Sequence, residues 1–190
     1  KFDGPYYLKI DGELIADGTE DQKIIFTSNK KNPAPKDWDK IRFEDSSVDW
    51  NGTNGSIIRN AKIEYAGADY GWQSNSIKIN SASPLIESNE ILNYQINPDP
   101  MLGITGISCI GGSPLINNNY ISGSGSIGIY GSNGCSPIIK GNTIINNLGA
   151  GINIYSGAKI INNVISNNKE TGIEMLGGND LIGNFISGSD

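Results

Sequence analysis

The chain has 190 residues, enough for one domain or two small ones, and its 37% hydrophobic and 18% charged residues exclude a disordered chain. Its formal net charge of −6 argues against nucleic acid or an anionic membrane surface as a partner. The absence of histidine excludes histidine acid–base catalysis and Ser-His-Asp triads, and no apolar run approaches the roughly 20 residues of a membrane span.

The residue types that dominate the chain favour short strands joined by tight turns. Isoleucine occurs 32 times and suits a pleated, half-buried surface. Asparagine occurs 24 times and glycine 25 times, and both are typical of tight turns. The composition therefore predicts an all-β chain with many short strands.

The first 55 residues predict irregular coils of chain. Residues 8–29 and 38–45 combine apolar alternation with turn residues, and together they supply roughly two turns. Residues 56–65, followed by residues 76–80, predict the next coil, in which Ala61 stands where later coils have asparagine.

A repeat organises the rest of the chain. Five segments share an Asn-x-Ile step: SPLIESNEI (83–91), SPLINNNYI (113–121), SPIIKGNTI (136–144), KIINNVI (159–165) and LIGNFI (181–186). The asparagines of this step are 30, 23, 21 and 21 residues apart: Asn89, Asn119, Asn142, Asn163 and Asn184. In three repeats a Gly-Ile segment begins seven residues after the isoleucine of the step. We expect the asparagines to stack at one corner and to form a ladder of hydrogen bonds.

A period of 21–23 residues predicts one coil of a parallel β-helix. Each coil would contain two or three short strands that pair with the coils about 4.8 Å above and below, so that inward isoleucines form a continuous core. A leucine-rich repeat is the alternative at this period, but the chain lacks its LxxLxL frame and any helical stretch.

The sequence resembles the right-handed parallel β-helix repeat proteins. The resemblance lies in GELIADGTEDQKIIFTSN, WDKIRFEDSS, IEYAG and the SPLIxxNxI…GIxI coils, and it covers residues 8–190. Such proteins include the pectin-lyase-like proteins and the carbohydrate-binding and sugar-hydrolase (CASH) modules of bacterial and archaeal surfaces. The resemblance implies an all-β, single-stranded, right-handed parallel β-helix of roughly seven to eight coils. It leaves the activity open, because lyases, hydrolases, epimerases and non-catalytic modules share this fold.

We expect one β-helix domain over residues 1–190, with irregular N-terminal coils in residues 1–55 and regular coils of 21–30 residues in 56–190. No helical cap pattern precedes Tyr6, and the glycine partner of Ile186 would lie beyond Asp190. We therefore expect the domain to be excised from a longer chain, and a non-standard terminal coil is the alternative.

The two cysteines, Cys109 and Cys135, align with different columns of the repeat. A disulfide needs Cα atoms within about 7 Å, which adjacent coils permit only with a favourable turn. We therefore expect buried free thiols rather than a bridge. A catalytic thiol has no histidine to activate it. The acidic segments lack the spacing of a calcium-binding loop, so we predict no metal site, no cofactor and no catalytic residue.

One outward column of side chains follows from the alternation along the second segment of each repeat: Arg42, Lys78, Ser108, Tyr130, Asn153 and Glu174. In the polysaccharide-active proteins of this fold, the resemblance implies a substrate groove on such a face. Arg42 beside Lys78 would place two like charges on adjacent coils. A solvated face with Glu44 and Asp39 as neutralising partners is the alternative to an anion site.

Two insertions interrupt the repeat at the same corner of consecutive coils, in residues 65–75 and 93–103. We expect these loops to stack and to form the only substantial concavity, because regular coils leave a flat wall. The predicted ligand-binding residues on them are Asp69, Tyr70, Trp72, Gln73, Tyr94 and Asp99, with Arg42 and Lys78 alongside. Aromatic, carboxylate and amide groups suit sugars, although the aromatics could instead pack the loops onto the coils.

These features favour a non-catalytic extracellular or cell-surface module that binds carbohydrate or acts as a structural spacer. Two acceptor sequons in one polar loop, at residues 51–53 and 54–56, agree with this location. The expected partner is a polysaccharide or cell-surface glycan, and the expected state is a monomer. The alternative is a polysaccharide (uronate) lyase or hydrolase, or a fragment of one, that uses Arg42 or Lys78. A periplasmic maturation factor is disfavoured because the chain has two methionines and no histidine.

Overall fold

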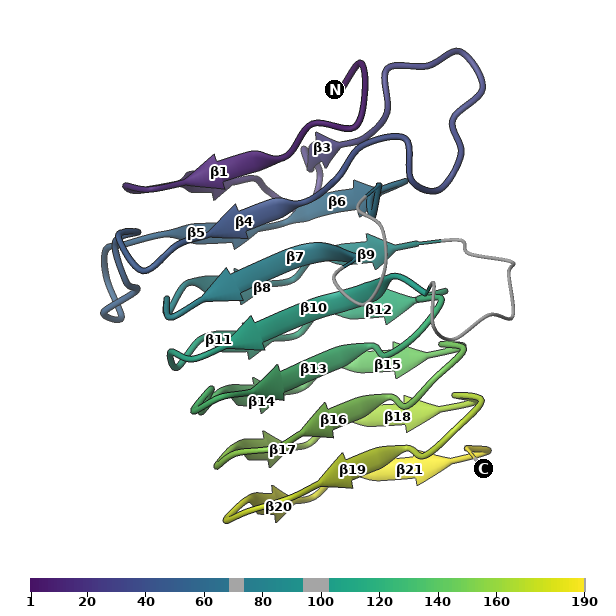
Figure 1. Ribbon diagram of the computed structural model, residues 1–190. Helices are drawn as coiled ribbons and strands as arrows, with labels where there is room; N and C mark the ends of the chain where they lie inside the picture. The colour runs from purple at the N-terminus through teal and green to yellow at the C-terminus, as the bar shows by residue number, and fades with distance from the viewer. Residues whose placement is uncertain (69–73, 94–102, 190) are drawn as a thin grey trace.

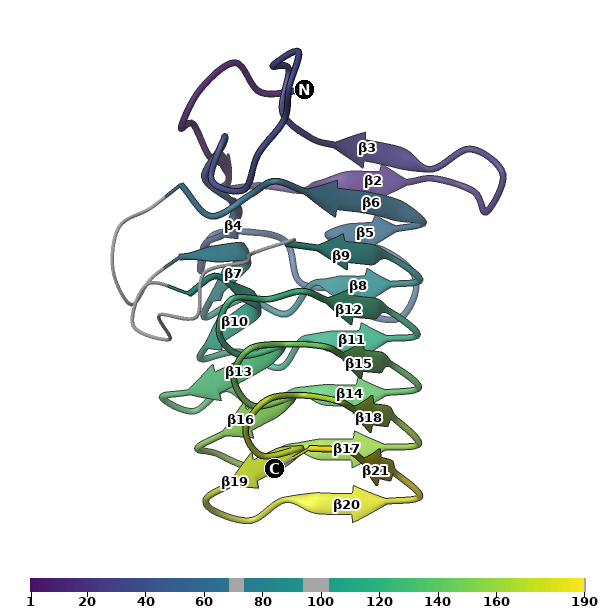
Figure 2. The ribbon, with the colours of Figure 1, turned by 90° about the vertical axis from the view of Figure 1, so that its right-hand side faces the viewer.

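The computed structural model describes residues 1–68, 74–93 and 103–189. In these ranges the chain winds through seven coils, each with three short strands, and has no helix (Figures 1 and 2). The strands of successive coils stack into three sheets of seven strands, and the strand pairs in these ranges are parallel. This confirms the predicted all-β parallel β-helix, with seven coils.

The three sheets are named here by their place in each coil. Sheet 1 stacks β1 (Leu8–Ile10), β4 (Ile41–Phe43), β7 (Asn75–Asn80), β10 (Thr105–Ile110), β13 (Ile129–Ser132), β16 (Ile152–Ile154) and β19 (Ile173–Met175). Sheet 2 stacks β2 (Ile15–Asp17), β5 (Ile57–Arg59), β8 (Leu85–Glu87), β11 (Leu115–Asn117), β14 (Ile138–Lys140), β17 (Lys159–Ile161) and β20 (Asp180–Ile182). Sheet 3 stacks β3 (Ile24–Phe26), β6 (Ala61–Glu64), β9 (Glu90–Leu92), β12 (Tyr120–Ser122), β15 (Thr143–Ile145), β18 (Val164–Ser166) and β21 (Phe185–Ser187).

The N-terminal coils differ from their expected boundaries. Coil 1 holds β1 to β3, and coil 2 begins with β4 and ends with β6. Residues 38–45 and 56–65, expected in separate coils, therefore belong to the same one. The reason is a long loop, residues 44–56, which joins β4 to β5 and carries the chain from sheet 1 to sheet 2.

Stacked isoleucines fill the interior between the three sheets. In sheet 2 each central residue points inward, and a fully buried isoleucine recurs in five consecutive coils: Ile58, Ile86, Ile116, Ile139 and Ile160. Sheet 3 has the equivalent column Ile63, Ile91, Ile121, Ile144 and Ile165. Burying one such side chain stabilises the fold by about 1.5–3 kcal/mol, so the repeated isoleucine is the main source of core stability.

The predicted asparagine ladder is present at the corner between sheets 2 and 3. The amide nitrogen of each ladder residue donates to the side-chain oxygen of the next, as from Asn119 to Asn142 at 3.0 Å and from Asn142 to Asn163 at 3.0 Å. The same nitrogen also donates to a buried backbone carbonyl, as from Asn142 to Ile116 at 3.0 Å. The ladder therefore satisfies polar backbone groups that the corner would otherwise bury without partners.

A second ladder, which the Asn-x-Ile pattern did not reveal, follows sheet 3. Asn147 donates to the side-chain oxygen of Asn168 at 2.9 Å, and the backbone N–H of Ser124 donates to Asn147 at 2.9 Å. The sequence signal is a pair of Asn-Asn doublets 21 residues apart, at 146–147 and 167–168.

Glycine at the start of sheet 1 is a steric requirement. A Cβ added to Gly128 would lie 2.6 Å from the Cγ2 of Ile144 and 2.6 Å from the carbonyl oxygen of Gly151. Gly151 meets the same obstacle against Ile165, at 2.6 Å. Each glycine therefore leaves room for the sheet 3 isoleucine of its own coil, which packs against the first residue of that coil.

The cysteines form a disulfide, so the expectation of free thiols was wrong. Cys109 at the end of β10 and Cys135 after β13 join coils 4 and 5, with Cα atoms 5.9 Å apart. A tight turn through Asn133 and Gly134, both at positive φ, brings Cys135 back over the coil. Cys109 pairs in register with Gly131, which has no side chain and leaves room for the second sulfur.

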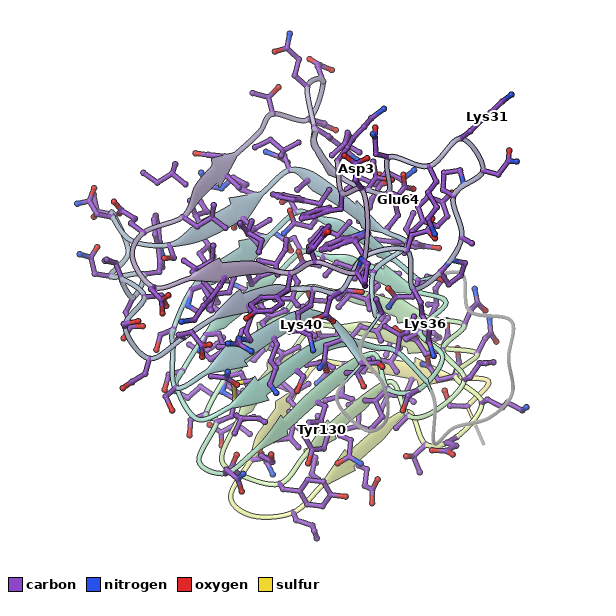
Figure 3. The ribbon with its side chains drawn as sticks, turned by 45° about the horizontal axis from the view of Figure 1, so that its top comes forward. Asp3, Lys31, Lys36, Lys40, Glu64 and Tyr130 are labelled. Carbon is purple, nitrogen blue, oxygen red and sulfur yellow. A yellow bond between two sulfur atoms is a disulfide. The ribbon has the colours of Figure 1, made fainter. Side chains whose placement is uncertain are left out.

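Charged residues are concentrated in the N-terminal part of the chain, where residues 1–70 hold 10 of the 14 basic and 13 of the 20 acidic side chains. Asp3, Lys31 and Glu64 lie at this end of the stack, whereas Tyr130 lies further along it (Figure 3). The Phe2 ring stacks on the buried ring of Trp38, with centroids 4.2 Å apart. This contact fastens the N-terminal segment to coil 2.

Asp37 is a buried carboxylate in the same region. It accepts hydrogen bonds from the Ser28 hydroxyl at 2.7 Å, from the Lys30 ammonium at 2.5 Å and from the Ala34 backbone N–H at 2.9 Å. Burial raises the pKa of the Asp37 carboxyl, but the three donors outweigh that effect and hold the pKa below its usual value.

Replacing Asn142 by alanine is expected to lower the free energy of unfolding by about 3 kcal/mol, because the buried donors of Asn119 and the carbonyl of Ile116 lose their partner. Urea unfolding followed by circular dichroism measures the loss. The control is Asn118→Gly, which changes an exposed corner residue at positive φ that is Gly141 in the next coil. Equal losses in the two variants would contradict the role of the ladder.

The double variant Cys109→Ala/Cys135→Ala is expected to lose about 3 kcal/mol of stability, because the bridge closes a loop with a sequence separation of 26. Thermal unfolding of the wild type with and without a reductant gives an independent measure. The reductant should lower the melting temperature of the wild type and leave that of the double variant unchanged. A wild type that is insensitive to reductant, with its thiols shown to be free, would speak against a stabilising bridge.

Asp37→Asn is expected to be less stable than the wild type at neutral pH, and the difference should shrink at low pH. A carboxyl whose folded pKa is depressed stabilises the fold above its unfolded pKa, and this contribution is lost as the pH falls through the folded pKa. Melting temperatures of both proteins between pH 7 and pH 2.5 test this. Asp45→Asn, on the exposed turn after β4, is the control. A gap that stays constant with pH would exclude the charge of Asp37 as its cause.

Candidate functional site

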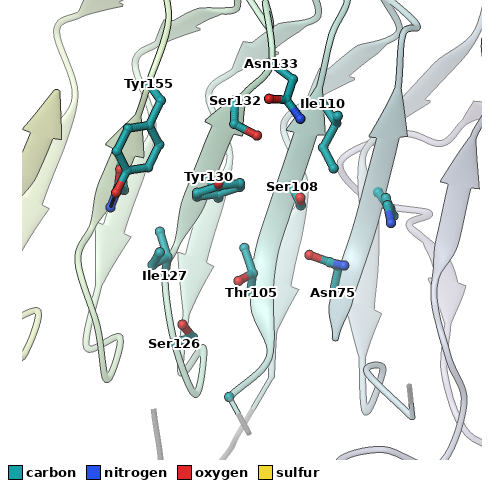
Figure 4. Close-up of a pocket in the computed structure, with 13 residues that line it drawn as sticks. Asn75, Thr105, Ser108, Ile110, Ser126, Ile127, Tyr130, Ser132, Asn133 and Tyr155 are labelled. Carbon is teal, nitrogen blue, oxygen red and sulfur yellow. Dashed lines mark hydrogen bonds between the residues drawn. The ribbon is translucent and has the colours of Figure 1, made fainter. Parts of the chain in front are cut away.

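An open groove of about 530 Å³ lies on the outward face of sheet 1 (Figure 4). Residues of β7, β10, β13 and β16 line it, together with short segments next to these strands. The side chains on which its chemistry depends are Asn75, Lys78, Ser108, Tyr130, Asn153 and Tyr155. This surface is called the sheet 1 groove below.

Strand register explains why these side chains meet. Lys78 pairs with Ser108, Ser108 with Tyr130, and Tyr130 with Asn153. The same pairing continues to Arg42 on one side and to Glu174 on the other. The predicted outward column is therefore confirmed along its whole length, and its middle four residues line the groove.

Differences in side-chain size hollow out the face. Ser108, which is 6% exposed, stands between the larger Lys78 and Tyr130. The neighbouring positions Thr105 and Ser126 are also small. We expected regular coils to leave a flat wall, but the structure shows a depression in it, because the small Ser108 stands between two large residues of the column.

Two tyrosines form the wall of the groove at coils 5 and 6. The rings of Tyr130 and Tyr155 meet edge to face, with centroids 6.0 Å apart and planes at 62°. Tyr155 follows β16 directly and is 44% exposed. In Figure 4 these rings lie on one side of the groove, and Asn75 lies on the other. An exposed ring of this kind offers an apolar face with a hydroxyl at its edge.

Asn153 is a deeply placed amide of the groove, only 7% exposed. Its Nδ2 donates to Oε2 of Glu174 at 2.7 Å and lies 3.5 Å from the hydroxyl of Tyr155. Its Oδ1 is shielded from bulk water and has no hydrogen-bond partner. The groove thus contains an acceptor whose hydrogen-bonding capacity is unused.

Arg42 lies outside the groove, and its positive charge is neutralised there. Its guanidinium forms an ion pair with Glu44 and lies over the Tyr7 ring, 4.8 Å from the centroid. A hydrogen bond from Asn80 at 2.9 Å and the charge of Arg42 hold the pKa of the Glu44 carboxyl below its usual value, although burial opposes them. Glu44 is therefore the counter-charge that was expected. Asp39 instead forms an ion pair with Lys40, at 3.3 Å.

The structure describes two of the predicted ligand-binding residues. Arg42 and Lys78 are neighbours in register on β4 and β7, and Lys78 lines the groove whereas Arg42 does not. The other six lie outside the described residues: Asp69, Tyr70, Trp72, Gln73, Tyr94 and Asp99. The outward column was predicted correctly, but Ser108, Tyr130 and Asn153 were not predicted as a site. The available signal was a small residue between two large ones in that column.

The lining of the groove is polar and aromatic. The residues that the structure describes along it supply amides, hydroxyls, tyrosine rings and one ammonium group, and include neither a carboxylate nor a thiol. Across residues 1–68, 74–93 and 103–189, no three His, Cys, Asp or Glu side chains come together as metal ligands. In the same ranges, no helix is long and apolar enough to cross a membrane.

Comparison with protein-family models matches residues 38–190 to the right-handed beta helix region. The chain belongs to this family. The match runs from coil 2 to the end of coil 7 and gives the hand of the coil, in agreement with the predicted fold. No curated protein and no solved structure shows significant similarity to this β-helix. Family membership therefore establishes the architecture, and any function has to be argued from the groove.

Proposed function

We propose that this β-helix is a non-catalytic carbohydrate-binding module, and that the sheet 1 groove is its binding surface. The observation that carries the proposal is the combination, in one open groove, of the Tyr130–Tyr155 pair with the amides of Asn75 and Asn153. Sugar rings have apolar faces and hydroxyl-bearing edges, so an aromatic wall and amide groups match both parts.

The geometry of the coils supports an extended ligand. The groove crosses coils 3 to 6, and adjacent coils lie about 4.8 Å apart, so the lining extends over roughly 14 Å. That length accommodates two to three sugar units rather than one. Because the scaffold is a rigid stack, the side chains are positioned before the ligand arrives, which lowers the entropy lost on binding.

The chemistry of the groove supports binding without catalysis. Glycoside hydrolysis needs two carboxyl groups beside the scissile bond, and the described lining of the groove supplies none. A lyase needs a basic group next to an acidic sugar, and Lys78 is the one basic side chain of that lining. Lys78 therefore keeps a uronate lyase as the second candidate.

The disulfide supports a location outside the cytoplasm. Structural bridges such as Cys109–Cys135 form and persist in oxidising surroundings, and cytosolic thiols are kept reduced. The two sequons lie on the loop between β4 and β5, where Asn51 and Asn54 are exposed. We propose an extracellular or cell-surface module that carries its glycan site on one face.

Tyr130→Ala and Tyr155→Ala are each expected to weaken glycan binding roughly fivefold, because each removes one stacking ring. Affinity is measured on a glycan array and then by titration calorimetry with the best ligand. Tyr120→Ala is the matched control, because Tyr120 is a 39% exposed tyrosine on the outward face of sheet 3. Binding that falls with Tyr120→Ala, or survives removal of both groove tyrosines, would place the ligand elsewhere. Formation of unsaturated uronate would favour the lyase alternative.

A further inference from the structure

The unused acceptor of Asn153 gives the groove a chemical preference. An amide oxygen that is buried without a partner is unfavourable, and a ligand that brings a donor removes this penalty on binding. The acceptor lies on β16 in the part of the groove bounded by the two tyrosines. A ligand seated there is therefore selected for an O–H or N–H group at this point.

Glu174 fixes which end of the amide is available. Its carboxylate can only accept, so the 2.7 Å contact assigns Nδ2 of Asn153 to the Glu174 side and Oδ1 to the other side. If the Asn153 amide were rotated by half a turn, its Oδ1 would face the Glu174 carboxylate, and two hydrogen-bond acceptors would lie against each other. Glu174 thus acts as a positioning residue that holds the acceptor of Asn153 in one orientation.

Tyr155 lies beside the Asn153 amide and can move away from it. Its ring is 44% exposed, and the contact between its hydroxyl and Asn153 is long, at 3.5 Å. Tyr130 is less exposed and lies on the neighbouring strand in register with Asn153. Rotation of Tyr155 away from Asn153 gives up this 3.5 Å contact and the edge-to-face contact with Tyr130, and it leaves the ring available to stack on the ligand.

The charges around the groove disfavour a polyanionic ligand. Lys78, at the coil 3 end, is the single charged side chain of the described lining, and the Glu174 carboxylate lies behind Asn153 at the coil 6 end. A polyuronate carries one carboxylate on each sugar. It would meet no second cation across coils 4 to 6 of the described lining, and it would approach Glu174 at the far end. The net charge of −6 adds to this repulsion.

We propose that the sheet 1 groove selects uncharged glycans because of the charges around it, and that Asn153, held by Glu174, recognises them by accepting a hydrogen bond from a hydroxyl or acetamido N–H of the sugar. The proposal rests on the proposed carbohydrate-binding function, and it names the class of glycan and the residue that recognises it. It predicts the opposite preference from that of a site built around Arg42 and Lys78 for acidic sugars.

The test compares six hexasaccharides on the full chain by titration calorimetry at 150 mM and 500 mM NaCl. The uncharged probes are cellohexaose, xylohexaose, mannohexaose and N-acetylchitohexaose, and the acidic probes are hexagalacturonate and hexaguluronate. At least one uncharged probe is expected to bind, with an affinity that changes less than twofold between the two salt concentrations. The acidic probes are expected to bind at least tenfold more weakly at 150 mM NaCl.

Two variants test the role of Asn153 directly. Asn153→Leu is expected to weaken binding of the uncharged probe by about tenfold, because the sugar donor then faces an apolar group. The double variant Asn153→Asp/Glu174→Gln keeps the net charge, because one carboxylate is gained and one is lost. In it the introduced glutamine amide donates to one oxygen of the introduced carboxylate and leaves the other oxygen as the acceptor, so binding is expected to return to within about threefold of the wild type. Melting curves confirm that each variant is folded.

The outcomes separate the two proposals. Tight, salt-sensitive binding of an acidic probe that is lost in the groove tyrosine variants would overturn the preference for uncharged glycans and leave the carbohydrate-binding function intact. Unchanged binding by a folded Asn153→Leu variant would overturn the role of Asn153. Absence of binding to every probe, or binding that survives removal of both groove tyrosines, would overturn the proposed function and this inference with it.

Discussion

The corner between sheets 2 and 3 imposes the constraint on which the rest of the structure depends. Each coil turns there through backbone that is buried between its neighbours, so its carbonyl groups need donors inside the protein. Asn89, Asn119, Asn142 and Asn163 supply them, each donating to a sheet 2 carbonyl and to the next rung. A shift of one coil by a single residue would break this ladder and turn the inward isoleucine outward. The ladder and the core therefore enforce one register.

A fixed register is also what makes a binding surface possible on a chain of short repeats. It places the outward residues of consecutive coils in line, so residues about 22 positions apart in sequence become neighbours, as Ser108 and Tyr130 do. The inward residues repeat because the buried backbone groups of the same corner need hydrogen-bond partners in every coil. The outward residues do not have to satisfy the corner, so they can differ from coil to coil. The change from Lys78 through Ser108 to Asn153 along one column produces both the depth and the polarity of the groove.

The sequence predicted those features that repeat, and it missed those that depend on a single turn or on relative size. The Asn-x-Ile period was sufficient for the parallel coil, the ladder and the outward column. The disulfide was missed because column alignment separates Cys109 from Cys135, and the turn at Asn133 and Gly134 closes that gap. The groove was missed because depth depends on comparing side-chain volumes across three strands. The partnerless oxygen of Asn153 required three-dimensional contacts and has no signature in the sequence.

The position of the disulfide limits where the stack of coils can open. A solenoid whose coils contact only their neighbours can open locally, by separation of one coil from the next. The bridge joins coils 4 and 5, so these two coils stay linked when the strand pairs between them open. Ser108 and Tyr130 lie on these two coils. The centre of the sheet 1 groove is therefore held together by a covalent bond as well as by strand pairing, and it is expected to keep its shape during partial openings elsewhere in the stack.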